Sequence, residues 1–429
     1  MKVPTNNIAP SLNNQLLQTW LNIMVFFLAF PSIYILQNSV YFYAFLMVLF
    51  ITKKITGHYF IKSRFNVIML ILFVSGLVSS ILHPTLKFDP GFFGKFNMVV
   101  HYAYWLAIGA YFASWLKYLN IYLLVKWIAI GFLAQVLAFY FFNTKIDLVV
   151  IKIAPGISRN GFVFNTICFS GFLLYFLYQK FGRIGLSVGS MFVLVALVFT
   201  NGRAGASVGF ILLILSLSVV HPLFRYFAKF GIVSLLVIIT LSGFSMERLY
   251  SIGSKIAPYV ESINPRFATL LQGEGEGDLS FDKSWLLRKL MVDKSFDILK
   301  KRPVFGIGFG NFTKYDSDLS TFYQYERLQY LDGDYINTRS AHNSYAGFAA
   351  ETGIIGFTLL LLLFVPQLLW FLKAYWQGNY TVHFIIIVSF IGAIIHMYTI
   401  ASITGANIWF LLGVVHGIKK LKPKRNLVL

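Results

Sequence analysis

Long apolar stretches separated by short polar turns run through most of this chain and predict a bundle of membrane-spanning helices. Most of them have roughly 17 to 25 residues, the length that a helix needs to cross a bilayer. The expected spans are 17–36, 39–53, 66–83, 97–115, 119–143, 161–180, 184–200, 204–222, 227–244, 345–372, 380–399 and 401–418. We therefore expect an all-α integral membrane protein with about 12 transmembrane helices.

One polar segment, 245–341, interrupts this pattern between the ninth and tenth spans. It separates a nine-helix region, 1–244, from a three-helix region, 342–429. The segment holds 13 of the 36 basic residues and 13 of the 16 acidic residues of the chain. Because it carries both signs of charge among apolar spans, we expect this large loop to face water and to carry elements of the functional site.

Composition and charge agree with a membrane protein. Apolar residues make up 57% of the chain and charged residues only 12%, about half the charge of a soluble domain. The net charge of +20 suggests nucleic-acid binding at first sight, but the excess lies in short loops and at the termini, where cytoplasmic Lys and Arg set orientation. We therefore predict no nucleic-acid partner, a membrane-lipid environment, and both termini in the cytoplasm.

This orientation places the large loop outside the cytoplasm. The first residues lack the regions of a cleavable signal peptide and are interpreted as a short cytoplasmic tail. The single cysteine, Cys168, allows no internal disulfide and is expected to pack inside a helix.

One helix is predicted inside the polar loop. Asp282 or Ser284 is suited to be its N-cap, and the helix should run to Lys300, shortly before a proline. An apolar stripe could hold Arg288 against the membrane surface while its guanidinium stays polar. Lys289 lies nearly as close to that stripe, so helix geometry alone does not single out Arg288. That stripe consists of Trp285, Arg288, Val292, Phe296 and Leu299.

The motifs of soluble enzymes are missing from the sequence. It has no phosphate loop, no HExxH zinc motif and no GxSxG nucleophile motif, so we expect neither a metal nor a cofactor. The segment GIGFGNF, 306–312, lacks the strand-turn-helix context of a dinucleotide fingerprint. A glycine-rich turn after a helix stop at Pro303 is favoured over a phosphate cradle.

Polar residues at the outer ends of spans are better candidates for chemistry. Arg203 lies in TNGRAGA, a short turn with small neighbours that would allow a bulky ligand to approach. It is interpreted either as an anion-binding residue or as a snorkelling or helix-capping arginine. His342 opens the tenth span and is a plausible general base, although an isolated interfacial histidine usually has a structural role.

These residues together resemble a known family. The resemblance rests on short motifs in a fixed order, namely Arg288, Pro303, GIGFGNF, His342-Asn343-Ser344 and the GIIG of 353–356. They look like the signature of the O-antigen ligase and O-antigen polymerase family, and the turn around Arg203 resembles the small-residue arginine turn of that family. The helix layout with one large periplasmic loop is similar as well.

The resemblance implies a metal-independent membrane glycosyltransferase of the GT-C type. It would act at the periplasmic face of the bacterial inner membrane on a glycan linked to undecaprenyl diphosphate. In family terms, Arg203 and Arg288 match the arginines that bind the lipid diphosphate, and His342 matches the histidine that activates the acceptor hydroxyl. Arg159 resembles a further family arginine more loosely.

Two reactions of the family remain open. A ligase transfers the glycan to lipid A–core, whereas a polymerase transfers it to another lipid-linked glycan; we expect ligation, with polymerisation as the runner-up and protein glycosylation third. Ala206 and Ser207 stand where leucines are common in the ligase turn. A lipid-linked glycan transporter is the alternative of a different class, but it would require charges in mid-span and related halves, and Lys126 is essentially the only mid-span charge.

Overall fold

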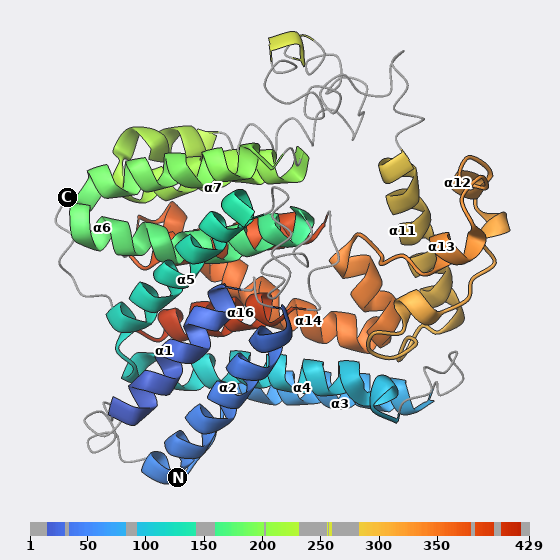
Figure 1. The fold of residues 1–429 in the computed structure, drawn as a ribbon, viewed down its shortest axis with the longest axis horizontal. Helices are drawn as coiled ribbons and strands as arrows, with labels where there is room; N and C mark the ends of the chain where they lie inside the picture. The colour runs from blue at the N-terminus through green and yellow to red at the C-terminus, as the bar shows by residue number, and fades with distance from the viewer. Residues whose placement is uncertain are drawn as a thin grey trace.

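The computed structural model is a helical bundle (Figure 1). It describes residues 15–30, 34–82, 92–142, 159–200, 203–230, 255, 257–259, 283–378, 382–398 and 405–421. These residues form helices, turns and irregular segments, with no strand among them. The predicted all-α class is therefore confirmed.

Apolar helices make up the body of the bundle. They are α1 (Gln15–Ala29), α2 (Tyr34–Thr56), α3 (Arg64–Leu82), α4 (Phe92–Trp115), α5 (Ile121–Phe142), α6 (Arg159–Val198), α7 (Arg203–Val220), α14 (Ser344–Trp376), α15 (Phe384–Met397) and α16 (Ala406–Lys419). The polar segment contributes α11 (Lys283–Lys301), α12 (Tyr323–Glu326) and α13 (Gly333–Asn337), with 3-10 turns η4 (Phe312–Lys314) and η5 (Leu319–Thr321).

Four helices in the described part of the chain are long and apolar enough to cross a membrane by themselves. They are α3, α5, α6 and α14, and four shorter apolar helices accompany them. The chain is thus a multi-pass membrane protein, as expected. The count of about 12 spans stays a prediction, since the span 227–244 lies mostly outside the described residues.

Helix α6 contains a chain reversal that accounts for two of the predicted spans. Gly182 adopts φ 58° and ψ −142°, a conformation that glycine reaches without steric cost. The second half of α6 folds back on the first. The close approach of the two halves is seen at Gly189, where a Cβ would lie 2.6 Å from the Leu177 side chain. The expected break between 161–180 and 184–200 is therefore present.

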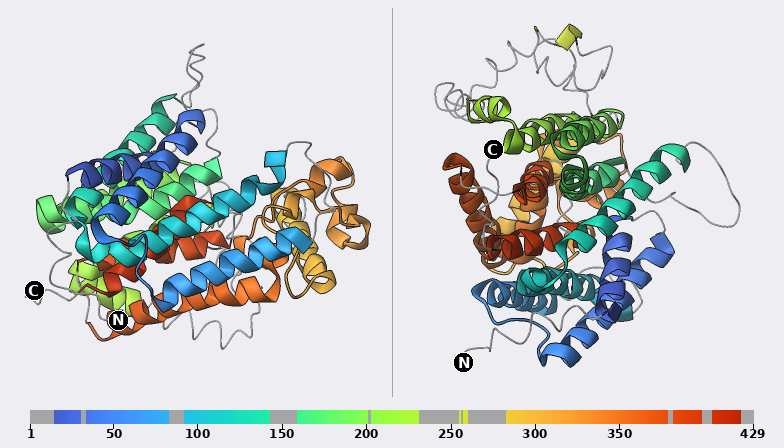
Figure 2. Two further views of the ribbon diagram at one scale, coloured as in Figure 1. Left: turned by 90° about the horizontal axis from the view of Figure 1, so that it is seen from below. Right: turned by 90° about the vertical axis from the view of Figure 1, so that its left-hand side faces the viewer.

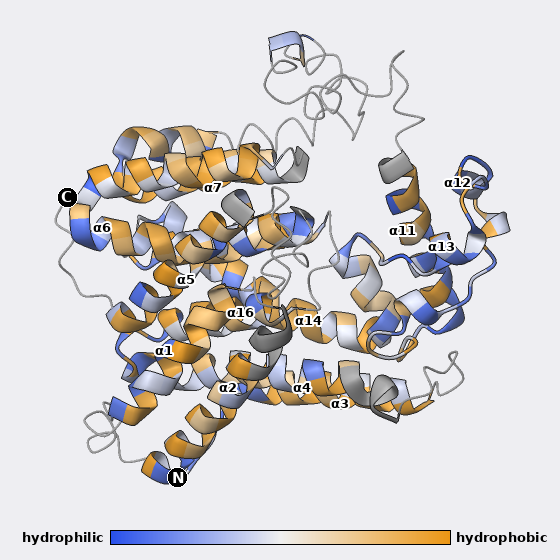
Figure 3. Ribbon diagram, viewed as in Figure 1, coloured by the Kyte–Doolittle hydropathy of each residue, from blue (hydrophilic) through white to orange (hydrophobic). Residues whose placement is uncertain are grey.

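The described polar segment has a hydrophobic core of its own. Leu290, Ile298, Phe312, Leu328 and Ile336 are buried together, apart from the large core shared by the membrane helices. Helices α11 to α13 gather at one end of the bundle, as both Figure 1 and Figure 2 show. That end is also the more hydrophilic one (Figure 3).

The buried face of α11 differs from the one predicted. Its buried apolar residues include Leu286, Leu290 and Ile298, spaced by four and eight residues along one face. Phe296, which the predicted stripe included, is 54% exposed. The assignment of that stripe was wrong, because the loop that packs over α11 selects the buried face. The predicted helix itself is confirmed, and so is the burial of Cys168.

Candidate active site

His342 occupies an unusual backbone position immediately before α14. Its φ is 50°, and it is the non-glycine residue with positive φ in the described part of the chain. Asn343 follows as the N-cap of α14, and its side-chain oxygen accepts hydrogen bonds from the main-chain N–H groups of Tyr345 and Ala346. Left-handed backbone at a non-glycine residue costs free energy and persists where the surroundings enforce it, often at functional sites.

Two arginines create a positive potential around this histidine. Burial lowers the pKa of His342 below its ordinary value, and Arg288 and then Arg339 lower the pKa further through their charge. A second positive charge on the imidazole is disfavoured by all three effects. These effects favour the neutral form of His342, and a neutral imidazole can accept a proton.

Arg288 on α11 also connects this region to the end of α15. It interacts electrostatically with His396, whose ring stacks on Phe164 of α6 at a centroid distance of 6.0 Å. The hydroxyl of Tyr345, three residues after His342, donates to the main-chain oxygen of Ile394 at 2.8 Å. Elements far apart in the sequence thus meet around Arg288 and His342.

The helices that begin with Arg159 and Arg203 approach the same region. A Cβ on Gly205, near the start of α7, would lie 3.1 Å from Val163, near the start of α6. Val163 is next in sequence to Phe164, which contacts His396. The starts of α6 and α7 therefore lie together. The side chains of Arg159 and Arg203 are outside the described residues, so their part in the site stays a prediction.

Arg339 is a site residue that the sequence analysis missed. Its guanidinium lies over the ring of Tyr335, 3.7 Å from the centroid. Its Nε is buried without a hydrogen-bond partner among the described residues. The signal was faint: an arginine three residues before His342, with a tyrosine one helical turn earlier. Only the fold brings the cation to the histidine.

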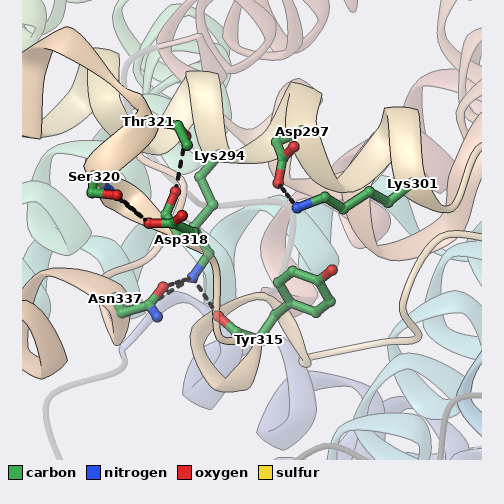
Figure 4. Close-up of polar contacts among 8 residues, drawn as sticks. All are labelled: Lys294, Asp297, Lys301, Tyr315, Asp318, Ser320, Thr321 and Asn337. Carbon is green, nitrogen blue, oxygen red and sulfur yellow. Dashed lines mark hydrogen bonds and ion pairs between the residues drawn. The ribbon is translucent and has the colours of Figure 1, made fainter.

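A buried lysine connects α11, the helix that carries Arg288, to the segment that precedes Arg339 and His342. Lys294 is fully buried on α11, and its ammonium donates to the main-chain oxygens of Tyr315 and Asn337, both at 2.8 Å, and to the Asn337 side chain at 2.6 Å (Figure 4). Burial lowers the pKa of Lys294 to about 8, while Asp316 acts in the opposite direction. The group is protonated at neutral pH and uses its three donors.

The glycine-rich segment clasps a break in α14. Gly353 interrupts that helix with φ 65° and ψ −169°, which leaves nearby main-chain groups without helical partners. Ile307 N–H donates to the Ala350 oxygen at 3.1 Å and Gly308 N–H to the Glu351 oxygen at 2.7 Å. Ile354 N–H in turn donates to the oxygen of Pro303 at 2.8 Å.

This clasp explains the glycines and excludes a phosphate cradle. Phe309 N–H donates to the Ser80 hydroxyl, and Phe312 N–H donates to the Glu351 carboxylate at 3.2 Å. The main-chain donors of 306–312 are thus largely used inside the protein, as the favoured interpretation of this segment required. A Cβ on Gly306 would lie 2.4 Å from the Ala350 oxygen, so the close packing needs glycine there.

Part of the chain is similar to a known protein family. The described residues contain no group of three or more His, Cys, Asp or Glu side chains that could hold a metal ion. Residues 188–362 match the family model described as O-Antigen ligase, and this segment includes Arg203, Arg288, Arg339 and His342 but not Arg159. No curated protein matches the chain. The match covers 175 of the 429 residues and supports the predicted resemblance to the O-antigen ligase and O-antigen polymerase family.

Proposed function

We propose that this protein is an O-antigen ligase-type glycosyltransferase. It moves a glycan from undecaprenyl diphosphate onto lipid A–core at the periplasmic face of the inner membrane. The observation that carries the proposal is the half-buried His342, whose pKa is lowered by burial and by the charges of two arginines, Arg288 and Arg339. A base beside fixed cations matches the needs of a reaction with an alcohol nucleophile and a diphosphate leaving group.

The reaction balances without a metal or an energy-rich cofactor. A hydroxyl oxygen of the acceptor attacks the anomeric carbon of the donor sugar, and the bond from that carbon to the diphosphate oxygen breaks. The hydroxyl proton passes to the neutral ring of His342. Undecaprenyl diphosphate leaves with the electron pair, and its charge is held by the guanidinium groups of Arg288 and Arg339, joined by Arg203 and Arg159.

Arginine suits this task for geometric reasons. Its planar fork binds two phosphate oxygens at once, and its charge persists at every physiological pH. The stack of Arg339 on Tyr335 fixes the plane of the guanidinium before the ligand arrives, so less conformational entropy is lost on binding. Lys294 supports the same arrangement by tying the segment before Arg339 to the helix of Arg288.

Deletion of the gene tests the proposal through the products that accumulate. A ligase mutant still builds long polymer but leaves it on undecaprenyl diphosphate, so lipopolysaccharide gels should show bare core. Complementation with the wild-type gene restores the ladder, and His342→Ala does not. A polymerase mutant instead transfers one repeat unit, and core plus one unit in both the deletion and the His342→Ala strain would overturn the ligase assignment in favour of polymerisation.

A further inference from the structure

A cavity of about 340 Å³ lies beside the segment that carries His342. Its walls come from the turn at 312–314, the segment around 340–344, the first turns of α14 and Met98 of α4. The volume is within the range of small-molecule sites. Arg288, Arg339 and His342 do not line it, so it is separate from the cationic group described above.

Several polar residues line this cavity. The oxygen of the Asn343 side chain caps α14, while its amide nitrogen has no hydrogen bond within the described residues. Thr313, Lys314 and Ser340 also line the cavity, and their side chains make no hydrogen bond or ion pair in the described part of the chain. A ligand rich in hydroxyl groups could satisfy all four.

The rest of the lining is apolar and partly aromatic. Phe312 and Phe348 are buried side chains of the wall, and Met98 completes the apolar surface. The centroid of the Phe312 ring also lies 4.9 Å from the Lys294 ammonium. A sugar ring has hydroxyl groups around its edge and C–H groups on its faces. It therefore matches a site with a few polar groups set in an apolar, aromatic wall.

The position of the cavity identifies which substrate it would hold. Ala341 and Asn343, the two chain neighbours of His342, both line it. A base must lie within hydrogen-bond reach of the attacking hydroxyl, whereas the donor diphosphate needs the arginines that lie outside the cavity. We propose that this pocket binds a sugar of the acceptor glycan, next to the sugar whose hydroxyl His342 activates. The inference rests on the proposed transferase function.

Filling the pocket tests the inference. Thr313→Trp should block it, and Thr321→Trp is the matched control, since Thr321 is an exposed residue of the other 3-10 turn in the same loop. Both variants and the wild type are reconstituted in proteoliposomes with the lipid-linked glycan donor. The acceptors tried are lipid A–core and the lipid-linked repeat unit, each purified from a strain that lacks the gene. Thr313→Trp should raise the acceptor KM about tenfold or more and leave the donor KM within about twofold.

A second pair of variants uses smaller changes, which are less prone to cause misfolding than tryptophan. Lys314→Ala should raise the acceptor KM about threefold, and Lys300→Ala, at an exposed lysine of α11, should not. A rise in the donor KM alone, or no change in either KM for both pocket variants, would overturn the assignment to the acceptor. If wild-type protein transfers nothing to either acceptor, the proposed function fails instead, which separates the two hypotheses.

Discussion

The ammonium of Lys294 donates a hydrogen bond of 2.6 Å to the side-chain oxygen of Asn337. Lys294 lies on the same helix as Arg288, and Asn337 ends the short helix that precedes Arg339 and His342. Asn337 is held from the other side by its amide, which donates to Asp316 at 2.5 Å. The bond therefore sets the position of one arginine relative to the other and to the histidine.

Replacing Lys294 by methionine should loosen this segment. The change keeps the length of the side chain but leaves the oxygens of Tyr315 and Asn337 without a donor in a buried site. We expect a local destabilisation of about 3 kcal/mol, so main-chain amides of 315–341 should exchange with deuterium about a hundredfold faster. Lys300→Met, at an exposed position of the same helix, is the control. Equal exchange in the two variants would contradict the role of Lys294.

The pH dependence of transfer should reflect the field around His342. Because the pKa of His342 is lowered, its neutral form persists to lower pH than for an ordinary histidine. The apparent pKa of the acid limb of the kcat/KM profile should therefore lie below about 6.5, the usual pKa of histidine. Arg339→Gln removes one of the charges that lower the pKa, so the acid limb should move to higher pH and activity at mildly acidic pH should drop.

Arg327→Gln is the matched control for this shift. Arg327 also lies over a tyrosine one helical turn earlier, Tyr323, at 4.8 Å from the ring centroid. It is exposed and does not act on the pKa of His342. Its pH profile should superimpose on that of the wild type. If both variants shift the acid limb equally, a general change of surface charge rather than Arg339 is responsible.

A positive charge at position 288 should not be sufficient to bind the donor diphosphate without the planar guanidinium of Arg288. Arg288→Lys keeps a cation on α11 but replaces a planar fork by a point charge. We expect kcat/KM for the donor to fall about tenfold or more, with the acceptor KM less affected. Arg302→Lys, at an exposed residue just after α11, should leave both unchanged. Full activity of Arg288→Lys would contradict bidentate binding of the diphosphate by this residue.

The helices of this protein were predictable because membrane spans leave a strong signal. An apolar run long enough to cross a bilayer has few alternatives to a helix, since its main-chain groups must be satisfied within the segment. The break of α6 at Gly182 was also predictable from the polar turn around it. The buried face of α11 was not, because two stripes on that helix carry apolar residues and only the packing of the loop decides between them.

Family motifs predicted some residues of the candidate site, whereas local sequence patterns did not predict others. Arg288 and His342 were singled out by their resemblance to family positions, and the structure places them within electrostatic reach of each other. Lys294 gave no signal, because a lysine in a loop of balanced charge is expected in solvent. Its burial depends on oxygens 21 and 43 residues away, which no local pattern reveals.

The orientation of the loop is open to a direct measurement. Charge bias predicts that the loop is periplasmic and that the turn between α2 and α3 is cytoplasmic. Glu326 and His58 are exposed residues of these two regions, and the native Cys168 is buried. Glu326→Cys should react with a membrane-impermeant maleimide in intact spheroplasts, and His58→Cys only after lysis. The opposite result would place the candidate site on the cytoplasmic side and remove it from the proposed donor.

Alanine substitutions at two glycines should separate the cost of a positive φ from the cost of disturbing the packing of segment 303–312 against the break in α14. Gly353 and Gly378 both have positive φ, 65° and 72°. A Cβ on Gly353 would lie 2.2 Å from the Val304 oxygen, whereas nothing lies within 4 Å of a Cβ on Gly378. Alanine at either position should cost about 1 kcal/mol from the backbone conformation, but only Gly353→Ala must also displace the segment after Pro303.

Thermal unfolding in detergent should therefore distinguish the two variants. Gly378→Ala should lower the midpoint by about 2 °C. Gly353→Ala should lower it at least three times as far or prevent folding, because the hydrogen bond from Ile354 N–H to the Pro303 oxygen is lost with the displacement. Transfer activity should fall with it, since the glycine-rich segment holds the first turns of α14 that follow His342. Equal midpoints for the two variants would mean that the clasp contributes little and that strain alone is being measured.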